Sequence, residues 1–528
     1  MVGEVAADQS LGLQGIGAGG AGYGYGRAEA KMRMRPGKPM QAISPAAQLA
    51  PAEYNREAYA HVAENDFHFV RDQPLSTFSI DVDTASYSNV RRFLREGRLP
   101  PADAVRIEEL INYFKYAYPQ PENDQPFATY AEVAACPWNS AHQLVHIGIA
   151  GKQLASAQVP ARNLVFLIDV SGSMQDQNKL PLLKRGMALL TRELRPQDHV
   201  SMVVYAGSSG LVLPSTAGSH KQRILEALER LEAGGSTNGA DGIELAYREA
   251  QKNFIQGGIN RVILATDGDF NVGVTSEGEL TRLIEDKRKS GVFLTVLGFG
   301  SGNLQDSRME QLADKGNGNY AYIDDLDEAH KVLVREAGAT LVTIAKDVKL
   351  QVEFNPERVQ SYRLVGYENR ALAARDFNDD KKDAGEIGAG HTVTALYEIV
   401  PRDPGQALGS EVDPLRYQSP HAPLPNPSRG ELLSVKVRYK APNADVSKLL
   451  ERPLSAPSAA PGSGSDVFRF AAAVAEFGLL LRNSAHKGSA SLEQVRTLAE
   501  STRAADPNGE RAQFLDMVKA SARLGLGG

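Results

Sequence analysis

The sequence predicts an α/β chain in which a doubly wound (Rossmann-like) segment is inserted in a β-sandwich, with helical segments towards both ends. Two observations support this fold class. Between residues 161 and 340, short apolar runs without polar alternation interleave with segments of helical period, which is typical of parallel strands covered by helices on both faces. After Thr340, apolar and polar residues alternate with period two, as they do in antiparallel strands, and residues 127–151 before that stretch are typical of two strands joined by a turn.

Composition and periodicity divide the chain into seven segments. In order, they are a disordered Gly-rich tail at 1–52, an N-terminal helical region at 53–126, sandwich strands at 127–160, the doubly wound segment at 161–340, further sandwich strands at 341–454, a linker at 455–465 and a C-terminal helical region at 466–528. The tail cannot bury enough apolar surface to offset the cost of ordering it. Since small sheets need several strands, we expect the strands at 127–152 to pair with strands after Thr340 in one sandwich.

Individual elements follow from the same patterns. In the doubly wound segment, the expected strands begin near Leu164, Val200, Val262, Phe293 and Tyr320, and the expected helices cover 179–194, 219–231, 239–254, 276–290 and 326–339. In the N-terminal region we expect a strand at 77–82, a helix at 86–95 and a second helix from Pro101 to about Tyr116.

Composition also excludes several classes of function. Apolar residues make up 42% and charged residues 23%, which is ordinary for a globular protein. The net charge of −6 favours neither a nucleic-acid partner nor an anionic membrane surface. The single cysteine, Cys136, excludes an internal disulfide framework, and no apolar run approaches the roughly 18 residues of a transmembrane helix.

One stretch of the doubly wound segment places polar side chains at the end of a buried strand. Leu164 to Ile168 form the apolar run, which stops at Asp169 and is followed by Ser171 and Ser173. In open parallel sheets, ligands sit beyond the carboxyl ends of the strands. One carboxylate and two hydroxyls are therefore expected at the edge where such folds bind ligands.

Two later stretches add to this set. Thr237 lies in the glycine-rich loop 234–242, and Asp267 follows the apolar run that begins near Val262. Oxygen ligands of this kind suit a hard cation, Mg²⁺ first, with Mn²⁺ or Ca²⁺ as alternatives. Two carboxylates balance one divalent ion, and neutral hydroxyls leave the ion able to accept one more anionic oxygen.

The D-x-S-x-S motif, the loop threonine and the later T-D-G motif resemble the metal-ion-dependent adhesion site (MIDAS) of von Willebrand factor type A (VWA) domains. The resemblance covers 161–340 and implies the metal ligands Asp169, Ser171, Ser173, Thr237 and Asp267. The whole layout, including SIDVDTASYSNVRRFL at 79–94 and EFGLLLRNS at 476–484, is similar to a bacterial family of multidomain VWA proteins. That family has a von Willebrand-associated region before the VWA domain and a C-terminal region of unknown function.

The family resemblance implies a metal-dependent adhesion or assembly module rather than an enzyme. Its protein partner would supply an Asp or Glu carboxylate to the ion. Many members of the family carry a lipoprotein signal, which implies the cell envelope, periplasm or surface, with a lipid tether in the precursor. No leader is recognisable here, so a cytoplasmic location stays open.

Two alternative functions also stay open. One is an intracellular assembly factor that partners an AAA+ ATPase. The other is a phosphatase using Asp81, because Asp81 and Asp83 follow an expected strand as in haloacid-dehalogenase-type phosphatases; Ala85, however, stands where those enzymes carry Thr or Val. We expect Asp83 or Thr84 instead to cap the helix that follows.

Two further groups of metal-binding residue types have simpler interpretations. His142 and His146 are four residues apart, which on a strand separates them by about 13 Å, so we expect ordinary strand surface. The acidic loop 376–386 carries Lys381 where a calcium loop needs glycine, so we expect a solvated hairpin. Whether this loop binds a second ion stays open, as do the partner and the oligomeric state.

Overall fold

The computed structural model describes residues 56–235, 240–268, 277–336, 341–382, 384–403, 405, 430–442, 444–455, 462–502 and 506–527. The tail expected at 1–52 lies outside these ranges. So do most of the linker expected at 455–465 and Thr237 of the expected metal site.

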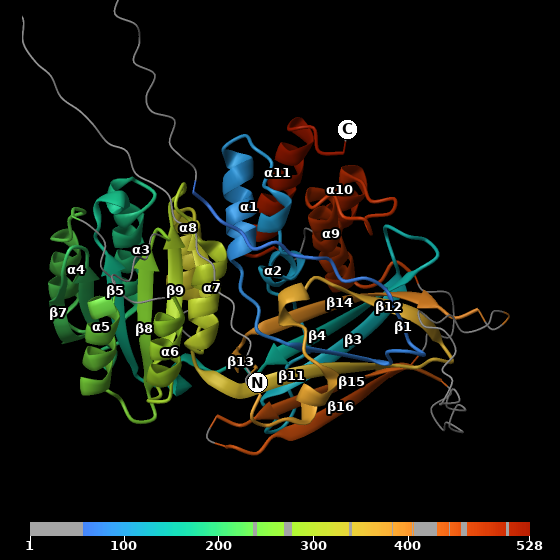
Figure 1. Ribbon diagram of the computed structural model, residues 1–528, viewed down its shortest axis with the longest axis horizontal. Helices are drawn as coiled ribbons and strands as arrows, with labels where there is room; N and C mark the ends of the chain where they lie inside the picture. The colour runs from blue at the N-terminus through green and yellow to red at the C-terminus, as the bar shows by residue number, and fades with distance from the viewer. Residues whose placement is uncertain are drawn as a thin grey trace, which may run out of the picture. The chain divides into compact units, whose positions relative to one another are not determined.

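The doubly wound segment forms a six-stranded sheet in the order β10-β9-β8-β5-β6-β7. Figure 1 labels β9, β8, β5 and β7 of this sheet. Its strands are β5 Arg162–Asp169, β6 His199–Tyr205, β7 Ser209–Ala217, β8 Ile259–Thr266, β9 Phe293–Phe299 and β10 Tyr320–Ile323. Neighbouring strands are parallel, except that β6 and β7 are antiparallel. Every residue of β5 is buried, as the continuous apolar run predicts for a strand covered on both faces.

Helices cover both faces of this sheet. They are α3 Leu180–Glu193, α4 Lys221–Glu229, α5 Ala240–Lys252, α6 Glu277–Arg288, α7 Asp306–Lys315 and α8 Leu326–His330, which continues as a π-helix at Lys331–Glu336. Leu164, Phe166 and Ile168 of β5 pack in one core with α3, α4 and α8. Val165 and Leu167 point to the opposite core, with α5, α6 and α7. The doubly wound fold expected from the sequence is confirmed.

The flanking segments form two further sheets. Their strands are β1 His68–Phe69, β2 Leu75–Ser79, β3 Phe127–Ala135, β4 Gln143–Gly151, β11 Thr343–Phe354, β12 Val359–Val365, β13 Gly385–Gly388, β14 Thr392–Pro401, β15 Glu431–Lys440 and β16 Lys448–Ser455. One sheet has the order β1-β12-β14-β4-β3. The other has the order β13-β11-β15-β16, with β2 also paired to β11. Residues of both sheets share one hydrophobic core, so the two sheets form a sandwich.

The sandwich joins strands from before and after the doubly wound segment. β4 pairs with β14 in antiparallel register, from Gln143 opposite Ile399 to Ala150 opposite Thr392. This confirms the pairing predicted between the 127–152 strands and strands after Thr340. β1 and β2 belong to the same two sheets, so residues before Phe127 also contribute to the sandwich.

Helices from both ends of the chain pack together in a third region. They are α1 Ala85–Arg95, α2 Ile107–Asn112, α9 Asp466–Leu481, α10 Leu492–Glu500 and α11 Glu510–Arg523. The single helix expected from Pro101 to Tyr116 is wrong, because Val105 and Arg106 have extended backbone angles that separate a short 3-10 turn from α2. The Ser86 hydroxyl stabilises the break: it donates to Ala104 O at 2.7 Å and accepts from Arg106 N at 2.9 Å.

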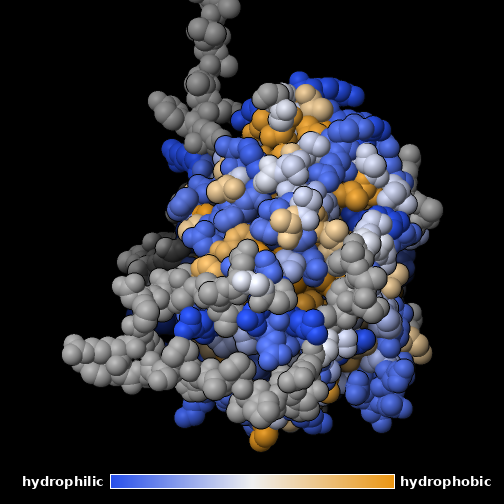
Figure 2. All heavy atoms as spheres, turned by 90° about the vertical axis from the view of Figure 1, so that its right-hand side faces the viewer, coloured by the Kyte–Doolittle hydropathy of each residue, from blue (hydrophilic) through white to orange (hydrophobic). Residues whose placement is uncertain are grey.

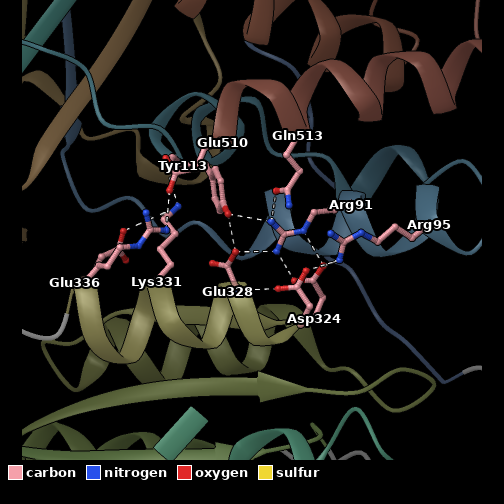
Figure 3. Close-up of polar contacts among 11 residues, drawn as sticks. Arg91, Arg95, Tyr113, Asp324, Glu328, Lys331, Glu336, Glu510 and Gln513 are labelled. Atoms are coloured by element: carbon pink, nitrogen blue, oxygen red, sulfur yellow. Dashed lines mark hydrogen bonds and ion pairs between the residues drawn. The ribbon is translucent and has the colours of Figure 1, made fainter. Parts of the chain in front are cut away.

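Buried charges connect these helices to the doubly wound segment (Figure 3). Arg91 of α1, whose side chain is 1% exposed, donates to Asp324 and to Glu328 Oε2, the latter at 2.8 Å. The same guanidinium donates to Tyr113 OH at 3.0 Å and to Gln513 Oε1 of α11 at 2.7 Å. Segments from the two ends of the chain therefore meet the end of the doubly wound segment at one arginine.

The outer surface is predominantly polar on the face shown in Figure 2, where small hydrophobic patches lie between hydrophilic side chains. Across the described residues, large apolar side chains that remain exposed include Leu211, Phe254 and Val446. No helix in the described part of the chain is long and apolar enough to cross a membrane.

Candidate metal site

Parallel pairing brings the two predicted acidic strand ends to one edge of the sheet. β5 and β8 are neighbours, and Ile168 lies opposite Ala265. The next residues of these strands lead directly to Asp169 and Asp267. Both aspartates are buried, with 0% and 1% of their surface exposed.

The carboxylate of Asp169 is held on both oxygens. Oδ1 accepts from Ser171 N at 2.9 Å, and Oδ2 accepts from Tyr205 OH at 3.2 Å and from Thr266 Oγ1 at 3.3 Å. Burial raises the pKa of Asp169 to about 6; the hydrogen bonds from Ser171 lower it in part, and the nearby charge of Asp267 adds to the rise. A cation at this edge would favour the ionised form of Asp169.

The two serines lie at the start of a tight turn after β5. Ser171 precedes the 3-10 turn Gly172–Gln175, and its Oγ is 3.0 Å from Ser173 Oγ. The turn is tied to the glycine-rich loop because Gly172 N donates to Gly235 O at 3.1 Å and Gly234 N donates to Val170 O at 2.7 Å. Thr237 follows in that loop, outside the described residues.

The sequence patterns did not indicate the remaining charged group, Lys179. Its Nζ donates to Ser173 O at 2.9 Å and to Asp267 Oδ2 at 3.1 Å, and lies 3.5 Å from Asp176 Oδ2. The lysine side chain is 5% exposed. A lysine at the start of an amphipathic helix is expected to be solvated, so the sequence does not indicate the contact between Lys179 and Asp267.

The segment that precedes β1 borders this edge. Gly268, directly after Asp267, has φ +101° and approaches the 303–305 backbone so closely that a Cβ would lie 2.5 Å from Asn303 O. Along the same loop, Ala58 N donates to Leu304 O at 3.0 Å and Gly302 N donates to Glu57 Oε1 at 2.9 Å. The loop after β9 is therefore held between the site and the start of the described chain.

The described donors fit a hard divalent cation. Adjacent oxygens around an octahedral Mg²⁺ are separated by about 3 Å, because each bond is about 2.1 Å long. The Ser171 and Ser173 hydroxyls have this separation, with the carboxylates of Asp169 and Asp267 at the ends of adjacent strands. Within the described ranges, no cluster of three or more His, Cys, Asp or Glu is arranged to hold a metal. A mixed set of hydroxyls and carboxylates is thus the candidate.

Asp81 and Asp83 lie elsewhere and have a different environment. Asp83 is buried, and its Oδ1 accepts from Tyr320 N at 2.7 Å, which fixes the start of β10. Arg370 lies 3.3 Å from Asp83 and 3.7 Å from Asp81. The predicted capping of α1 is wrong: Thr84 occupies the N-cap position without a side-chain bond, and Asp83 is used for β10.

The expected solvent exposure is also wrong for His146 of β4, whereas His142, directly before β4, is partly exposed. His146 is fully buried, its Nε2 is 2.6 Å from Tyr118 OH, and burial lowers its pKa to about 4. His142 Nδ1 is 2.6 Å from Glu398 Oε1. The sequence could not reveal this burial, because Tyr118 and Phe468 of α9 cover this face of the strand. In the acidic loop 376–386, Asp376 lies 3.8 Å from Lys382.

A doubly wound sheet whose central strand ends in D-x-S-x-S defines the class of VWA-domain proteins. The family model of the von Willebrand factor type A domain matches residues 163–335, and that of von Willebrand factor matches residues 53–146. The model for the C-terminal part of the uncharacterized protein YfbK matches residues 339–524. YfbK of Escherichia coli K12 is 45% identical over 468 residues, which cover 87% of this chain and 80% of that protein. The chain belongs to the YfbK family of multidomain VWA proteins.

Other likenesses are more distant. Human inter-alpha-trypsin inhibitor heavy chain H4 is 26% identical over 177 residues, which cover 32% of this chain and 19% of that protein. A von Willebrand factor type A structure from Catenulispora acidiphila is 18% identical with a TM-score of 0.42, covering 76% of this chain and 92% of that one. The multidomain VWA family expected from the sequence is confirmed, and the chain therefore carries a protein-interaction or adhesion module.

Proposed function

We propose that the chain is a divalent-metal-dependent protein-binding module, acting in adhesion or assembly and not as an enzyme. Mg²⁺ is the proposed ion, with Mn²⁺ or Ca²⁺ as substitutes, held by Asp169, Ser171, Ser173 and Asp267 together with Thr237. The observation that supports this proposal is the pair of serine hydroxyls 3.0 Å apart beside two buried carboxylates. These groups lie where doubly wound sheets bind ligands.

An acidic side chain of the partner is the proposed sixth ligand. Mg²⁺ takes about six oxygen ligands, so five protein groups leave one position for an incoming oxygen. A carboxylate is favoured there over a neutral oxygen because the serine and threonine hydroxyls donate little charge to the ion. The partner's remaining contacts would come from the loops around this edge, including 207–210 and 271–275, of which 271–275 lie outside the described residues.

The metal proposal is tested by calorimetric titration of Mg²⁺ and Mn²⁺ into the full chain. Wild type should bind one ion, and Asp169→Ala should bind it at least about tenfold more weakly, because half of the anionic charge is lost. Asp327→Ala, a change at an exposed aspartate of α8, is the matched control and should bind as wild type does. Equal affinities for wild type and Asp169→Ala would contradict the site.

The partner proposal is tested by capture from the source cell with and without chelator. We expect binding to be lost in EDTA and with Ser171→Ala while circular dichroism shows an unchanged fold. Changing one Asp or Glu of the captured partner to Ala should also abolish binding. A partner held equally well in EDTA would show that another surface is used.

We further propose a location in the cell envelope. The support is the resemblance of the motifs at 79–94 and 476–484 to the bacterial multidomain VWA family, since many members of that family carry lipoprotein signals. Fractionation of the source cell measures this directly.

A further inference from the structure

A lysine ammonium occupies a position beside the candidate metal ligands. Lys179 Nζ lies 3.1 Å from Asp267 Oδ2 and 2.9 Å from Ser173 O. It therefore contacts one proposed ligand through its carboxylate and a second through its main chain. The Lys179 ammonium thus lies at the same edge of the sheet as the proposed divalent ion.

The surrounding backbone holds this lysine in place. Gly300 has φ +73°, and a Cβ at that position would lie 2.3 Å from Lys179 Cε, so the lysine stem fills the space that a larger residue would need. Burying an ammonium is unfavourable unless anions and hydrogen-bond acceptors surround it. Here Asp267 and the Ser173 carbonyl are such partners, which distinguishes Lys179 from a mobile surface lysine.

Lys179 changes the charge of the site. The buried carboxylates of Asp169 and Asp267 would neutralise a divalent ion by themselves, but with Lys179 they carry a net charge of only −1. Asp176, the other acid near Nζ, has 70% of its side chain exposed, so water screens its charge. A divalent ion at this edge therefore leaves a net positive charge in a buried environment.

We propose that Lys179 is a specificity-determining residue that weakens metal binding by the free protein and strengthens binding of a carboxylate to the metal-loaded site. Repulsion between the ammonium and the ion causes the first effect. The uncompensated positive charge causes the second, because an anionic oxygen from the partner restores neutrality. This inference rests on the proposed function and assigns its preference for acidic partners to one residue.

The experiment compares four forms of the full chain: wild type, Lys179→Met, Lys179→Gln and the control Lys184→Met. Lys184 lies on α3, which begins directly after Lys179, but its Nζ donates to the carbonyls of Glu229 and Leu231 rather than to an acid. In Mn²⁺ titrations, both Lys179 variants should bind at least about tenfold tighter than wild type, and Lys184→Met should match wild type. A gain in affinity is a result that loss of structure would not produce.

The second measurement uses acetate as a carboxylate probe. Water-proton relaxation of the Mn²⁺-loaded protein reports replacement of metal-bound water. Acetate should act on wild type and Lys184→Met at concentrations at least about tenfold lower than on the Lys179 variants.

The outcomes separate this inference from the proposed function. A wild type that binds no Mn²⁺ would contradict the metal site itself. Wild type that binds Mn²⁺ while folded Lys179→Gln binds it no tighter would overturn the role of Lys179. Equal acetate binding by loaded wild type and loaded Lys179→Gln would overturn it as well. The glutamine variant retains a hydrogen-bond donor, so it serves if Lys179→Met fails to fold.

Discussion

At the scale of single residues, the site combines a buried carboxylate, Asp169, with a buried ammonium, Lys179. Asp169 accepts hydrogen bonds from Ser171, Tyr205 and Thr266, yet its pKa is raised to about 6 because burial outweighs these bonds. A group that is unfavourable in its charged form and still buried at a strand end is typical of a functional position. The loss of folding stability that the ionised Asp169 carboxylate causes in the metal-free protein can be measured.

We predict that Asp169→Asn stabilises the metal-free protein at pH 8 by about 3 kcal/mol. The folded-state pKa of about 6 exceeds the ordinary value of 3.8, so the folded form holds an extra proton between these values. Stability contributed by Asp169 is therefore greatest below about pH 4 and is lost as the pH rises through 6. Asparagine is neutral throughout and avoids this loss.

Urea unfolding in EDTA at pH 4.5 and pH 8 checks this prediction. The stabilisation should be large at pH 8 and small at pH 4.5. Asp327→Asn on the surface of α8 should change stability at neither pH. A destabilised Asp169→Asn at pH 8 would show that the ionised carboxylate is favourable even without metal.

A site residue could be predicted from the sequence only where the residues that identify it are close together along the chain. Asp169, Ser171 and Ser173 lie within five residues, at a strand end that the apolar run defines, and the structure places all three at that edge. Lys179 could not be predicted, because its burial depends on Gly300, which lies on a different strand connection.

At the scale of elements, α8 and its π-helical continuation connect the sheet to both helical regions. Arg91 binds Asp324 and Glu328, and Lys331 Nζ donates to Tyr113 O at 2.7 Å (Figure 3). Arg335 lies 2.8 Å from Glu510. The sequence predicted one regular helix at 326–339. The structure changes to a π-helix at Lys331–Glu336, a stretch that includes the long-range contacts of Lys331 and Arg335.

Arg91→Met should destabilise the protein by about 3–5 kcal/mol, because two carboxylates lose their buried cation. Arg95→Met is the matched control, one turn further along α1. Its side chain is 48% exposed, so we expect a loss below about 1 kcal/mol. Urea denaturation at pH 7 measures both. Similar losses for the two variants would show that the Arg91 cluster adds little beyond a surface ion pair.

Elements that the sequence patterns did not indicate are short and polar or lie at an edge. β7, with sequence SGLVLPSTA, contains proline and glycine and forms the edge of the six-stranded sheet. α7, with sequence DSRMEQLADK, has few apolar residues to mark a helical face. Strands β5, β6, β8, β9 and β10 were predictable because their apolar runs are buried on both faces.

At the scale of the whole molecule, the sandwich depends on residues from both sides of the doubly wound segment. β14 lies between β12 and β4, so a fragment that begins after Thr340 lacks the partner on one of its edges. β11 likewise loses β2, whose Thr77 Oγ1 accepts from Gln351 Nε2 at 2.9 Å. Both sheets would then expose unpaired backbone groups.

We therefore predict that residues 341–528, expressed alone, aggregate, because exposed strand edges pair with other copies of the chain. Residues 53–528, which keep β2 and β4, are the control and should remain monodisperse under the same conditions. Size-exclusion chromatography with light scattering distinguishes the two. A soluble 341–528 fragment with cooperative thermal unfolding would show that its strands are stable without β2 and β4.

Because β4 pairs with β14, β4 cannot complete its sheet until β14 has been synthesised. His146 lies opposite Leu396, so at roughly 5–20 residues per second the ribosome needs on the order of tens of seconds to deliver the partner strand. All strands of the six-stranded sheet emerge during this interval. The doubly wound segment can thus fold while β3 and β4 wait as an open hairpin, and a chaperone that binds unpaired strands would act on this chain at that stage.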